Sequence, residues 1–397
     1  MTWKASLVLV ALVVACGDSS DGSGGGSGMG GSIGDVFPCT EQGIRDAIAV
    51  GGGPHTFDCD GPTTVVTEAE IMIRRSVILD GEGKLTLEAK LTVDAEQRAS
   101  VLSVRGDGPA ELRGVTLRGG RSYSGSGIQN HGVLTLVDSE VSDNRGRGAG
   151  GGILNKGELT LINTRVSGNT TSAVGGGIVN DVGAVLTLIE STVSANHAPH
   201  ARGGGIANRG TLTLTNSTVA SNTAGGGGGI DNDGTVTLTN STVSGNTVTP
   251  GFLESTAGGG GIWNVGTLKL TDSTVSGNTA TEGGGIWNGI GTLTLINTLI
   301  DNDCEGKAPT SGGGNLESPG DTCAFDQPTD QANVSAEDLK LGELGDNGGP
   351  TMTHALLPGS VAIDVIPAEM CAGDTDQRGE PRPGDTICDV GAFEVQP

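Results

Sequence analysis

The sequence predicts an all-β protein whose short strands stack as the coils of a right-handed parallel β-helix. Three observations predict this fold class. A unit of about 24 residues recurs seven times between Gly127 and Asn302, two asparagines hold fixed places in each unit, and the residues between them alternate between polar and apolar side chains. Repeats of this length are typical of solenoids, in which each unit buries its apolar face by stacking on its neighbours.

The repeat has one half of fixed length and one half of variable length. The two asparagines are 14 residues apart in every unit except one, in which Asn180 and Asn196 are 16 apart. The distance to the next unit's isoleucine varies, from 8 residues after Asn222 to 16 after Asn246. Stacked coils must keep register along their paired strands, so the sequence predicts that length changes fall on one edge. The first asparagines are Asn130, Asn155, Asn180, Asn208, Asn232, Asn264 and Asn288, and the second are Asn144, Asn169, Asn196, Asn222, Asn246, Asn278 and Asn302.

The fixed half contains the predicted strands. Thr211–Thr215, Thr235–Thr239 and Thr292–Ile296 alternate Thr with Leu or Val, and alternation with period two indicates a strand with the apolar residues inward and threonine outward. Coils that stack at ~4.8 Å would pair each strand with those above and below. A right-handed turn is the strong default for parallel crossovers.

The asparagines and glycines are interpreted as structural. Asparagine tolerates left-handed backbone angles and bonds its own backbone, which favours it at tight corners. Identical side chains in adjacent coils can also form hydrogen-bonded ladders. The Gly-Gly-Gly before each isoleucine supplies positive-φ freedom at the variable edge and is not a phosphate site, because no helix or lysine follows it.

The regular repeats at 127–302 require a cap at each end. Residues 35–126 are the predicted N-terminal cap and irregular first coils. They begin with a short amphipathic helix, Cys39–Ile48, which places Ile44 and Ala47 on its apolar face together with Ile48. Residues 303–397 are the predicted C-terminal cap, which bears two cysteine loops that close that end. The irregular strands of the first coils are expected at Thr64–Thr67, Ile71–Leu79 and Glu111–Leu117.

The N-terminus predicts export and a lipid anchor. Residues 1–15 contain Lys4 and then an apolar run that is too short to span a bilayer but typical of a signal peptide. Val13-Val14-Ala15-Cys16 resembles the bacterial lipobox, which implies lipidation of Cys16. Residues 16–34 then form a Gly/Ser tether. We therefore expect a protein bound to a membrane through its lipid, in the bacterial cell envelope or at the surface, on the outer membrane or outside it.

The charge of the chain argues against nucleic acid as a partner. Lysine and arginine number 22 against 46 aspartates and glutamates, a formal charge of −24. Removal of residues 1–15 takes away Lys4 and leaves 21 basic residues and a charge of −25. Such a surface repels nucleic acid and anionic lipid. We expect a monomer whose ligand is a glycan or a protein.

Six of the seven cysteines are predicted to form disulfides. Neighbour pairing gives Cys39–Cys59, Cys304–Cys323 and Cys371–Cys388, each closing a short loop outside the regular repeats. Six cysteines allow 15 arrangements, so sequence alone leaves the connectivity open. Disulfides suit an oxidising compartment, and the chain has no C-x-x-C or nearby histidine to support zinc instead.

Three segments resemble known bacterial families. The Gly-Gly-Gly-Ile-x-Asn and Asn-Ser-Thr-Val-Ser-x-Asn units resemble the polymorphic outer-membrane protein type repeats of right-handed β-helix proteins. Cys39–Ile48 resembles the CSLREA motif, although Thr-Glu-Gln-Gly replaces its usual residues. The tail, with Leu344-Gly-Asp-Asn-Gly-Gly-Pro, Thr375-Asp-Gln-Arg-Gly and Cys388-Asp-Val-Gly-Ala-Phe-Glu, is similar to the choice-of-anchor Q region. The resemblance implies fold and export, and it carries no established activity.

A carbohydrate-active enzyme is the alternative function, because right-handed β-helices include pectin-active enzymes. Glycoside hydrolysis needs paired carboxylates, and lyases need a cationic base, usually with calcium. Arg378-Gly-Glu-Pro-Arg382 superficially resembles a pectate lyase motif, but it lies in the terminal cysteine loop. No catalytic residue is therefore assigned. In the column aligned with Asn216, amides separate the acids from one another, and the column contains Asp138, Asn163, Glu190, Asn216, Asn240, Asp272 and Asn297.

Two further features are candidate binding residues. Trp263 and Trp287 occupy the same slot in successive units and should stack one coil apart, either as an exposed ligand patch or packed against the loop at 247–261. Asp231 and Asp233 bring two acids together, which leaves calcium as an alternative to the expectation of no cofactor and no metal site. The sequence thus favours a non-enzymatic cell-surface lipoprotein, adhesin-like or envelope-structural. A pectin-lyase-like polysaccharide lyase or glycoside hydrolase is the alternative.

Overall fold

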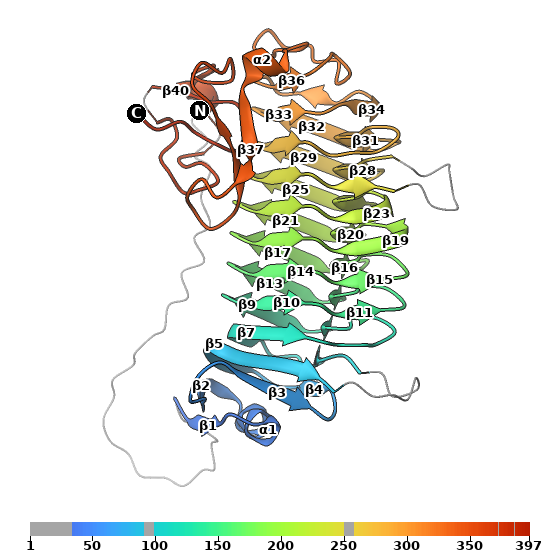
Figure 1. The fold of residues 1–397 in the computed structure, drawn as a ribbon, viewed down its shortest axis with the longest axis vertical. Helices are drawn as coiled ribbons and strands as arrows, with labels where there is room; N and C mark the ends of the chain where they lie inside the picture. Colours follow the sequence, from blue (N-terminus) through green and yellow to red (C-terminus); the bar gives the residue numbers. More distant parts are fainter. Residues whose placement is uncertain (1–33, 91–98, 250–257, 372, 385) are drawn as a thin grey trace, which may run out of the picture. The chain divides into compact units, whose positions relative to one another are not determined.

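The computed structural model describes residues 34–90, 99–249, 258–371, 373–384 and 386–397. These residues form a parallel β-helix, so the predicted fold class is confirmed (Figure 1). Each regular coil contributes two strands to a long sheet and one strand to a second sheet that runs beside it, and several coils add a short strand at a third edge. Cys16 and the tether lie outside the described residues.

The strands of the regular coils are paired parallel to their neighbours in the next coil. In the long sheet the first strand of each coil is β9 (Val133–Val137), β13 (Glu158–Ile162), β17 (Val185–Ile189), β21 (Thr211–Thr215), β25 (Thr235–Thr239), β29 (Thr267–Thr271), β32 (Thr292–Ile296) or β35 (Thr310–Ser311). The second strand of each coil is β10 (Glu140–Ser142), β14 (Arg165–Ser167), β18 (Thr192–Ser194), β22 (Thr218–Ala220), β26 (Thr242–Ser244), β30 (Thr274–Ser276), β33 (Leu299–Asp301) or β36 (Leu316–Ser318).

The second sheet contains the strands that end at the first asparagine series, and the third sheet lies on the variable edge. The second sheet consists of β4 (Ile71–Ile73), β6 (Leu102–Val104), β8 (Ile128–Asn130), β12 (Ile153–Asn155), β16 (Ile178–Asn180), β20 (Ile206–Asn208), β24 (Ile230–Asn232), β28 (Ile262–Asn264), β31 (Ile286–Asn288) and β34 (Cys304–Gly306). The third sheet consists of β11 (Arg145–Gly146), β15 (Thr170–Thr171), β19 (His197–Arg202), β23 (Thr223–Gly226) and β27 (Thr247–Val248).

The core is a column of aliphatic side chains inside the coils. In β21, Leu212 and Leu214 are buried while Thr211 is exposed, which is the alternation that the sequence predicts. Val219 and Ile206 complete the same coil and are also buried. Each coil therefore closes a small apolar cross-section, and stacking turns these sections into one continuous core.

Both asparagine series form the predicted ladders. In the first series, the Nδ2 of each asparagine donates to the Oδ1 of the next at 2.8–2.9 Å, from Asn130 to Asn288. In the second series, the same bond measures 2.9–3.1 Å from Asn144 to Asn302. A buried amide that lost these partners would cost about 1–3 kcal/mol. The ladders therefore hold the coils in register.

A third file of residues forms the turn between the two strands of the long sheet. We call it the turn file, and every member has a left-handed backbone with φ between 45° and 50°. Asparagine and aspartate tolerate this region better than most residues, which explains why they occupy six of its seven places. The members are Asp138, Asn163, Glu190, Asn216, Asn240, Asp272 and Asn297.

The glycine triplets on the variable edge serve two purposes. The first glycine has a positive φ, as at Gly203 (71°), which the sequence predicts. The other two allow close stacking: a Cβ on Gly204 would lie 2.4 Å from the carbonyl oxygen of Gly228 in the next coil. The second and third positions of the triplet therefore require glycine because the backbones of adjacent coils approach closely, and not only because of a positive φ.

The N-terminal cap contains the predicted helix as α1 (Glu41–Val50). Thr40 caps it by accepting a hydrogen bond from the Gly43 amide at 3.1 Å, and Ile44 and Ala47 are buried. The expected strand Ile71–Leu79 is instead two strands, because residues 74–76 turn the chain from one sheet to the other. The remaining strands are β1 (Val36–Pro38), β2 (Gly52–Asp58), β3 (Thr63–Thr67), β5 (Val77–Ala89) and β7 (Ala110–Arg118).

The C-terminal region does more than close the end. β36 and α2 (Ala336–Leu339) lie beyond the last regular coils, whereas the residues that follow fold back along the flank of the helix (Figure 1). We call residues 341–397 the C-terminal segment. It differs from the expected end cap because its backbone and side-chain groups find polar partners on the turn file and on β22, β26 and β30. It contains β37 (Leu341–Gly345), β38 (Thr353–Leu356), β39 (Ile366–Pro367), a 3-10 helix (Ala368–Met370) and β40 (Ile387–Cys388).

Candidate functional site

The C-terminal segment covers the flank formed by the turn file and the second strands from Asn216 upward. Thr218 donates its hydroxyl to the Met352 carbonyl at 2.7 Å, and Asn240 donates its amide to the Thr375 carbonyl at 2.8 Å. Gln377 is fully buried and joins the flank to the segment, because it accepts from the Thr242 hydroxyl at 2.6 Å. This part of the flank is therefore closed to a ligand.

A buried ion network lies beneath the segment. Arg382 donates to Glu394 at 3.0 Å and lies 3.6 Å from Asp272 of the turn file. Burial raises the pKa of Asp272, and the nearby Arg382 opposes the rise. Burial also raises the pKa of Asp389 to about 6. These charges hold the segment to the flank, so the pectate-lyase-like Arg378-Gly-Glu-Pro-Arg382 stretch has a structural role: Arg378 pairs with Asp376 at 2.7 Å.

Below the covered coils, the same flank opens into a polar groove of about 300 Å³. We call it the flank groove. The turn-file residues Asp138, Asn163 and Glu190 line one side. Pro350 also lines the groove and precedes Thr351, which bonds Asn216 in the next coil, so the groove borders the covered part of the flank. The second-strand residues that line it are Thr116, Glu140, Arg165 and Thr192.

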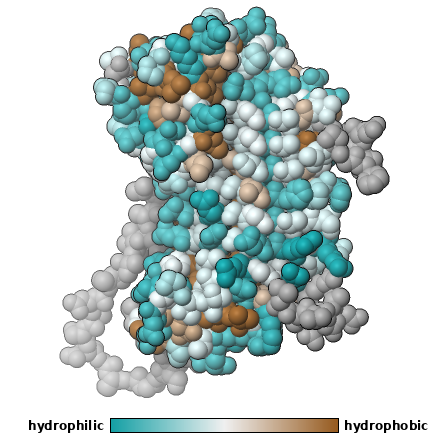
Figure 2. Space-filling model, in the orientation of Figure 1, coloured by the Kyte–Doolittle hydropathy of each residue, from teal (hydrophilic) through white to brown (hydrophobic). Residues whose placement is uncertain are grey.

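The charges of the flank groove are mostly open to solvent. Asn163 donates to the Asp138 carboxylate at 2.6 Å, and Glu140 accepts from the Ser167 hydroxyl at 3.4 Å. The Arg165 side chain is exposed and makes no ion pair or side-chain hydrogen bond with the described residues. Three carboxylates and one unpaired guanidinium from neighbouring coils thus line the groove. In Figure 2, hydrophilic and neutral residues dominate the middle coils of the face shown.

The two tryptophans stack on the outer side of the second sheet. Their ring centroids are 3.7 Å apart with an interplanar angle of 17°. Trp263 is only 7% exposed, and the Arg202 guanidinium lies 4.3 Å from its ring centroid. Gly258 also lies against both rings. Trp287 is therefore the more open ring of the pair, and a ligand role for them remains a prediction.

Asp231 lies in register with Trp263 in the adjacent coil. Burial raises the pKa of Asp231 to about 7, with a further increase from Asp233. Its Oδ1 and the Trp263 indole nitrogen have no hydrogen-bond partner among the described residues. Asp233 faces Arg209 at 3.9 Å instead of joining Asp231 around a common point. Among the described residues no three metal-ligating side chains converge, and calcium binding stays a prediction.

The six cysteines outside the N-terminus pair as the sequence predicts. The S–S bonds are Cys39–Cys59, Cys304–Cys323 and Cys371–Cys388. The first two pairs lie at the ends of the β-helix core, and the third lies within the C-terminal segment. Three disulfides are typical of secreted or surface proteins. Within the described residues, no helix has the length and apolar character that a membrane crossing requires.

Sequence reasoning found the turn file but missed the second-strand residues of the groove. Glu140 and Arg165 each lie two positions after a turn-file residue, and they pair directly in register. The corresponding residues in later coils are Thr192, Thr218, Thr242 and Thr274. The change from charged residues to threonine along this register was the signal that could have located the groove.

The comparisons agree with the fold. Residues 100–280, less than half of the chain, match the family described as the right handed beta helix region. The chain is also similar to the crystal structure of pectate lyase Pel9A, with 15% identity, a TM-score of 0.52, and coverage of 93% of this chain and 98% of that one. No curated protein matches the sequence. Fold and family match together define a right-handed parallel β-helix protein, and the likeness to the lyase concerns the fold alone.

Proposed function

We propose that this protein is a non-enzymatic β-helix of the bacterial cell surface, anchored through a lipid on Cys16, that binds an extended polymer along the flank groove. Its role is adhesin-like. The observation that carries the proposal is the groove itself, an open polar channel built by the same register position in four successive coils. Stacked coils at ~4.8 Å present a row of side chains, which suits a ligand that is itself elongated.

The placement of the acidic groups supports binding rather than catalysis. In glycoside hydrolysis the general acid is a carboxyl group whose raised pKa keeps it protonated near neutral pH. Here the carboxyl groups with a strongly raised pKa, Asp231 and Asp389, are buried beneath other segments. They do not line the groove, so a bound polymer would not reach them.

A polysaccharide lyase or glycoside hydrolase is the second candidate. The unpaired Arg165 beside Glu140 favours it, because a cation among carboxylates in an open groove is the kind of arrangement a lyase site uses. The pectate lyase named above shares the fold. Fold alone does not define an activity, so this candidate depends on the groove residues themselves.

One experiment separates the two candidates. The full-length protein is incubated with a panel of uronate and neutral glycans, with and without calcium, and both reducing sugars and unsaturated products are measured. We expect no turnover. Turnover that disappears in both Arg165→Ala and Glu140→Gln, while Glu158→Gln retains it, would replace the binding function with the enzymatic one. Glu158 is an exposed acid on β13 outside the groove lining, so it controls for a change of charge.

The lipid anchor is tested separately. We expect labelled palmitate to enter the wild-type protein during growth and not the Cys16→Ser variant, which should leave the membrane fraction. Incorporation of label into Cys16→Ser, or membrane retention of that variant, would contradict the anchor.

A further inference from the structure

The covered and open parts of the flank are one continuous surface. Thr116, Glu140, Arg165, Thr192, Thr218, Thr242 and Thr274 occupy one register position in successive coils. The turn file runs beside them in the same order. The C-terminal segment lies on the upper part of this surface, and the flank groove is the part that it leaves open.

The covered part shows what this surface binds. It holds the C-terminal segment through backbone groups of that segment: Thr218 donates to the Met352 carbonyl at 2.7 Å, and the Ala392 amide donates to the Thr274 hydroxyl at 3.0 Å. The turn file takes part as well, because Asn297 donates to the Met370 carbonyl at 2.9 Å. Threonine hydroxyls and turn amides thus act as partners for a polypeptide backbone.

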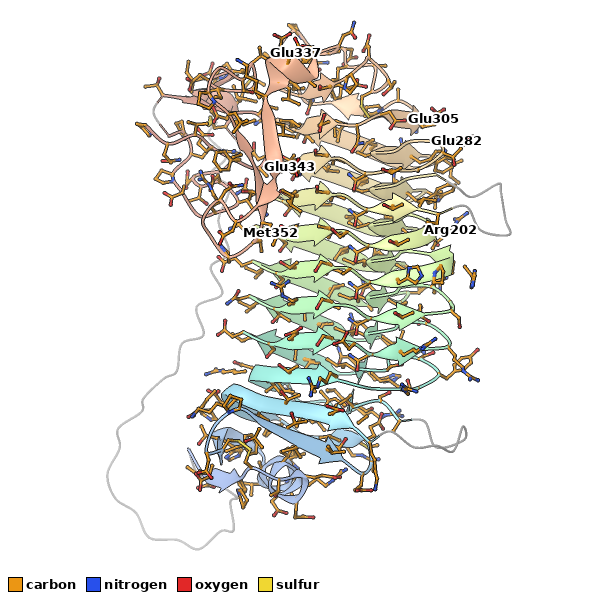
Figure 3. The ribbon with its side chains drawn as sticks, in the orientation of Figure 1. Arg202, Glu282, Glu305, Glu337, Glu343 and Met352 are labelled. Atoms are coloured by element: carbon orange, nitrogen blue, oxygen red, sulfur yellow. A yellow bond between two sulfur atoms is a disulfide. The ribbon has the colours of Figure 1, made fainter. Side chains whose placement is uncertain are left out.

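The bound chain also runs along the axis of the coils. Thr351 donates to the Asn216 carbonyl at 2.9 Å, and His354 bonds Ser244, one coil further on, at 2.8 Å. Figure 3 shows Met352 on this flank and Glu343 further along it. A polypeptide can therefore lie across successive coils and meet one set of donors and acceptors after another.

We propose that the flank groove binds an extended, basic polypeptide segment of a partner protein in the manner in which the upper flank holds the C-terminal segment. This inference rests on the proposed binding function and names its ligand class. Asn163 and Thr192 supply the same kinds of group as Asn240 and Thr218, at equivalent positions. The charges select the partner: Asp138, Glu140 and Glu190 face the ligand against a single cation, Arg165.

The composition of the groove favours polypeptide over glycan, and its length fits a short extended segment. None of the residues that line the groove is aromatic, whereas small-ligand sites are commonly lined by apolar and aromatic side chains. The length also fits, since four coils span three steps of ~4.8 Å, or about 14 Å, which an extended chain covers with about four residues at ~3.3 Å each.

The test uses the full-length protein and a short labelled peptide of alternating lysine and threonine. Binding is followed by fluorescence anisotropy at two salt concentrations. We expect the Glu140→Gln/Glu190→Gln variant to raise Kd by about fivefold to tenfold and to reduce the salt dependence, because exposed charge pairs contribute modestly and are screened. Thr192→Val should raise Kd by about threefold through the loss of one neutral hydrogen bond.

The matched control is Glu158→Gln/Glu305→Gln. It changes the net charge equally, but both residues are exposed and lie outside the groove lining, and Glu305 is seen on the opposite edge in Figure 3. Equal weakening by both double variants would show a general charge effect and overturn the proposal. So would equal affinity for a glutamate–threonine peptide. A neutral glucan that binds in the groove where the basic peptide does not would overturn the polypeptide ligand and leave the binding function intact, whereas glycan turnover would remove both.

Discussion

The flank of the β-helix has a covered part and an open part that share one backbone but differ in their side chains. Threonine or, at the last such position, Leu299 occupies the second-strand position in the covered coils, and the one turn-file acid there, Asp272, is matched by Arg382. In the open coils the same position holds Glu140 and Arg165, beside Asp138 and Glu190 in the turn file. A buried charge without a partner costs several kcal/mol. The C-terminal segment therefore stops where unmatched charges begin.

Arginine provides the sharpest test of this comparison. Arg382 is fully buried between Asp272 and Glu394, and its loss would strand two buried carboxylates. We expect Arg382→Ala to lower the free energy of unfolding of the C-terminal segment by about 3–5 kcal/mol, measured by hydrogen exchange. Arg165→Ala in the open groove should change stability by less than about 0.5 kcal/mol. Equal effects at the two sites would break the comparison.

The buried Asp231 of β24 should make the stability of the protein depend on pH. Asp231 is buried and its pKa is raised from 3.8 to about 7, so folding favours its protonated form. Its contribution to stability is present below about pH 4 and is lost as pH rises through about 7. Asparagine cannot ionise, so we expect Asp231→Asn to gain on the order of 3 kcal/mol relative to wild type between pH 4 and pH 8. Urea unfolding at both pH values measures this gain, and a difference that does not depend on pH would contradict it.

The smallest expected effect comes from two threonines of one register position. Thr218 in the covered part donates to Met352 and accepts from Gln377 at 2.9 Å, whereas Thr192 faces the groove. We expect Thr218→Val to cost about 1–2 kcal/mol in urea unfolding, because buried polar groups lose a partner. Thr192→Val should be near neutral. If Thr218→Val is also neutral, threonine on the covered flank does not hold the segment.

Most of the fold could be predicted from sequence because its determinants repeat. The asparagines of the two ladders and the Leu/Thr alternation recur at constant spacing, and each recurrence specifies the same place in a coil. The C-terminal segment does not repeat. Gln377 bonds Thr242, and Arg382 lies beside Asp272, although more than a hundred residues separate the partners in each pair. No regular spacing in the sequence predicts such pairs. The sequence therefore predicted the disulfides of the C-terminal region but did not predict that this region covers the flank.

For a related reason, the sequence predicted the turn-file residues of the candidate site but not its second-strand residues. The turn file stands out because a left-handed backbone selects asparagine and aspartate. Glu140 and Arg165 interrupt a threonine pattern, and their meaning depends on whether another segment covers them. Likewise, the slot shared by Trp263 and Trp287 predicts stacking, but the burial of Trp263 depends on Arg202 and Gly258 from elsewhere on the edge.

The asparagine ladders also bear on self-association. Every amide in a ladder points the same way, so each file has one end that needs a donor and one that needs an acceptor. The chain supplies both for each file. In the first file the Gly132 amide donates to Asn130 at 3.2 Å, and Asn288 donates to the Lys307 carbonyl at 2.7 Å. In the second file the Gly120 amide donates to Asn144 at 2.8 Å, and Asn302 donates to the Asn278 carbonyl at 2.9 Å. Because both ends of each file are already hydrogen-bonded within the chain, a second molecule stacked end to end would gain no ladder hydrogen bond. The ladders therefore do not favour growth of the solenoid into a fibre.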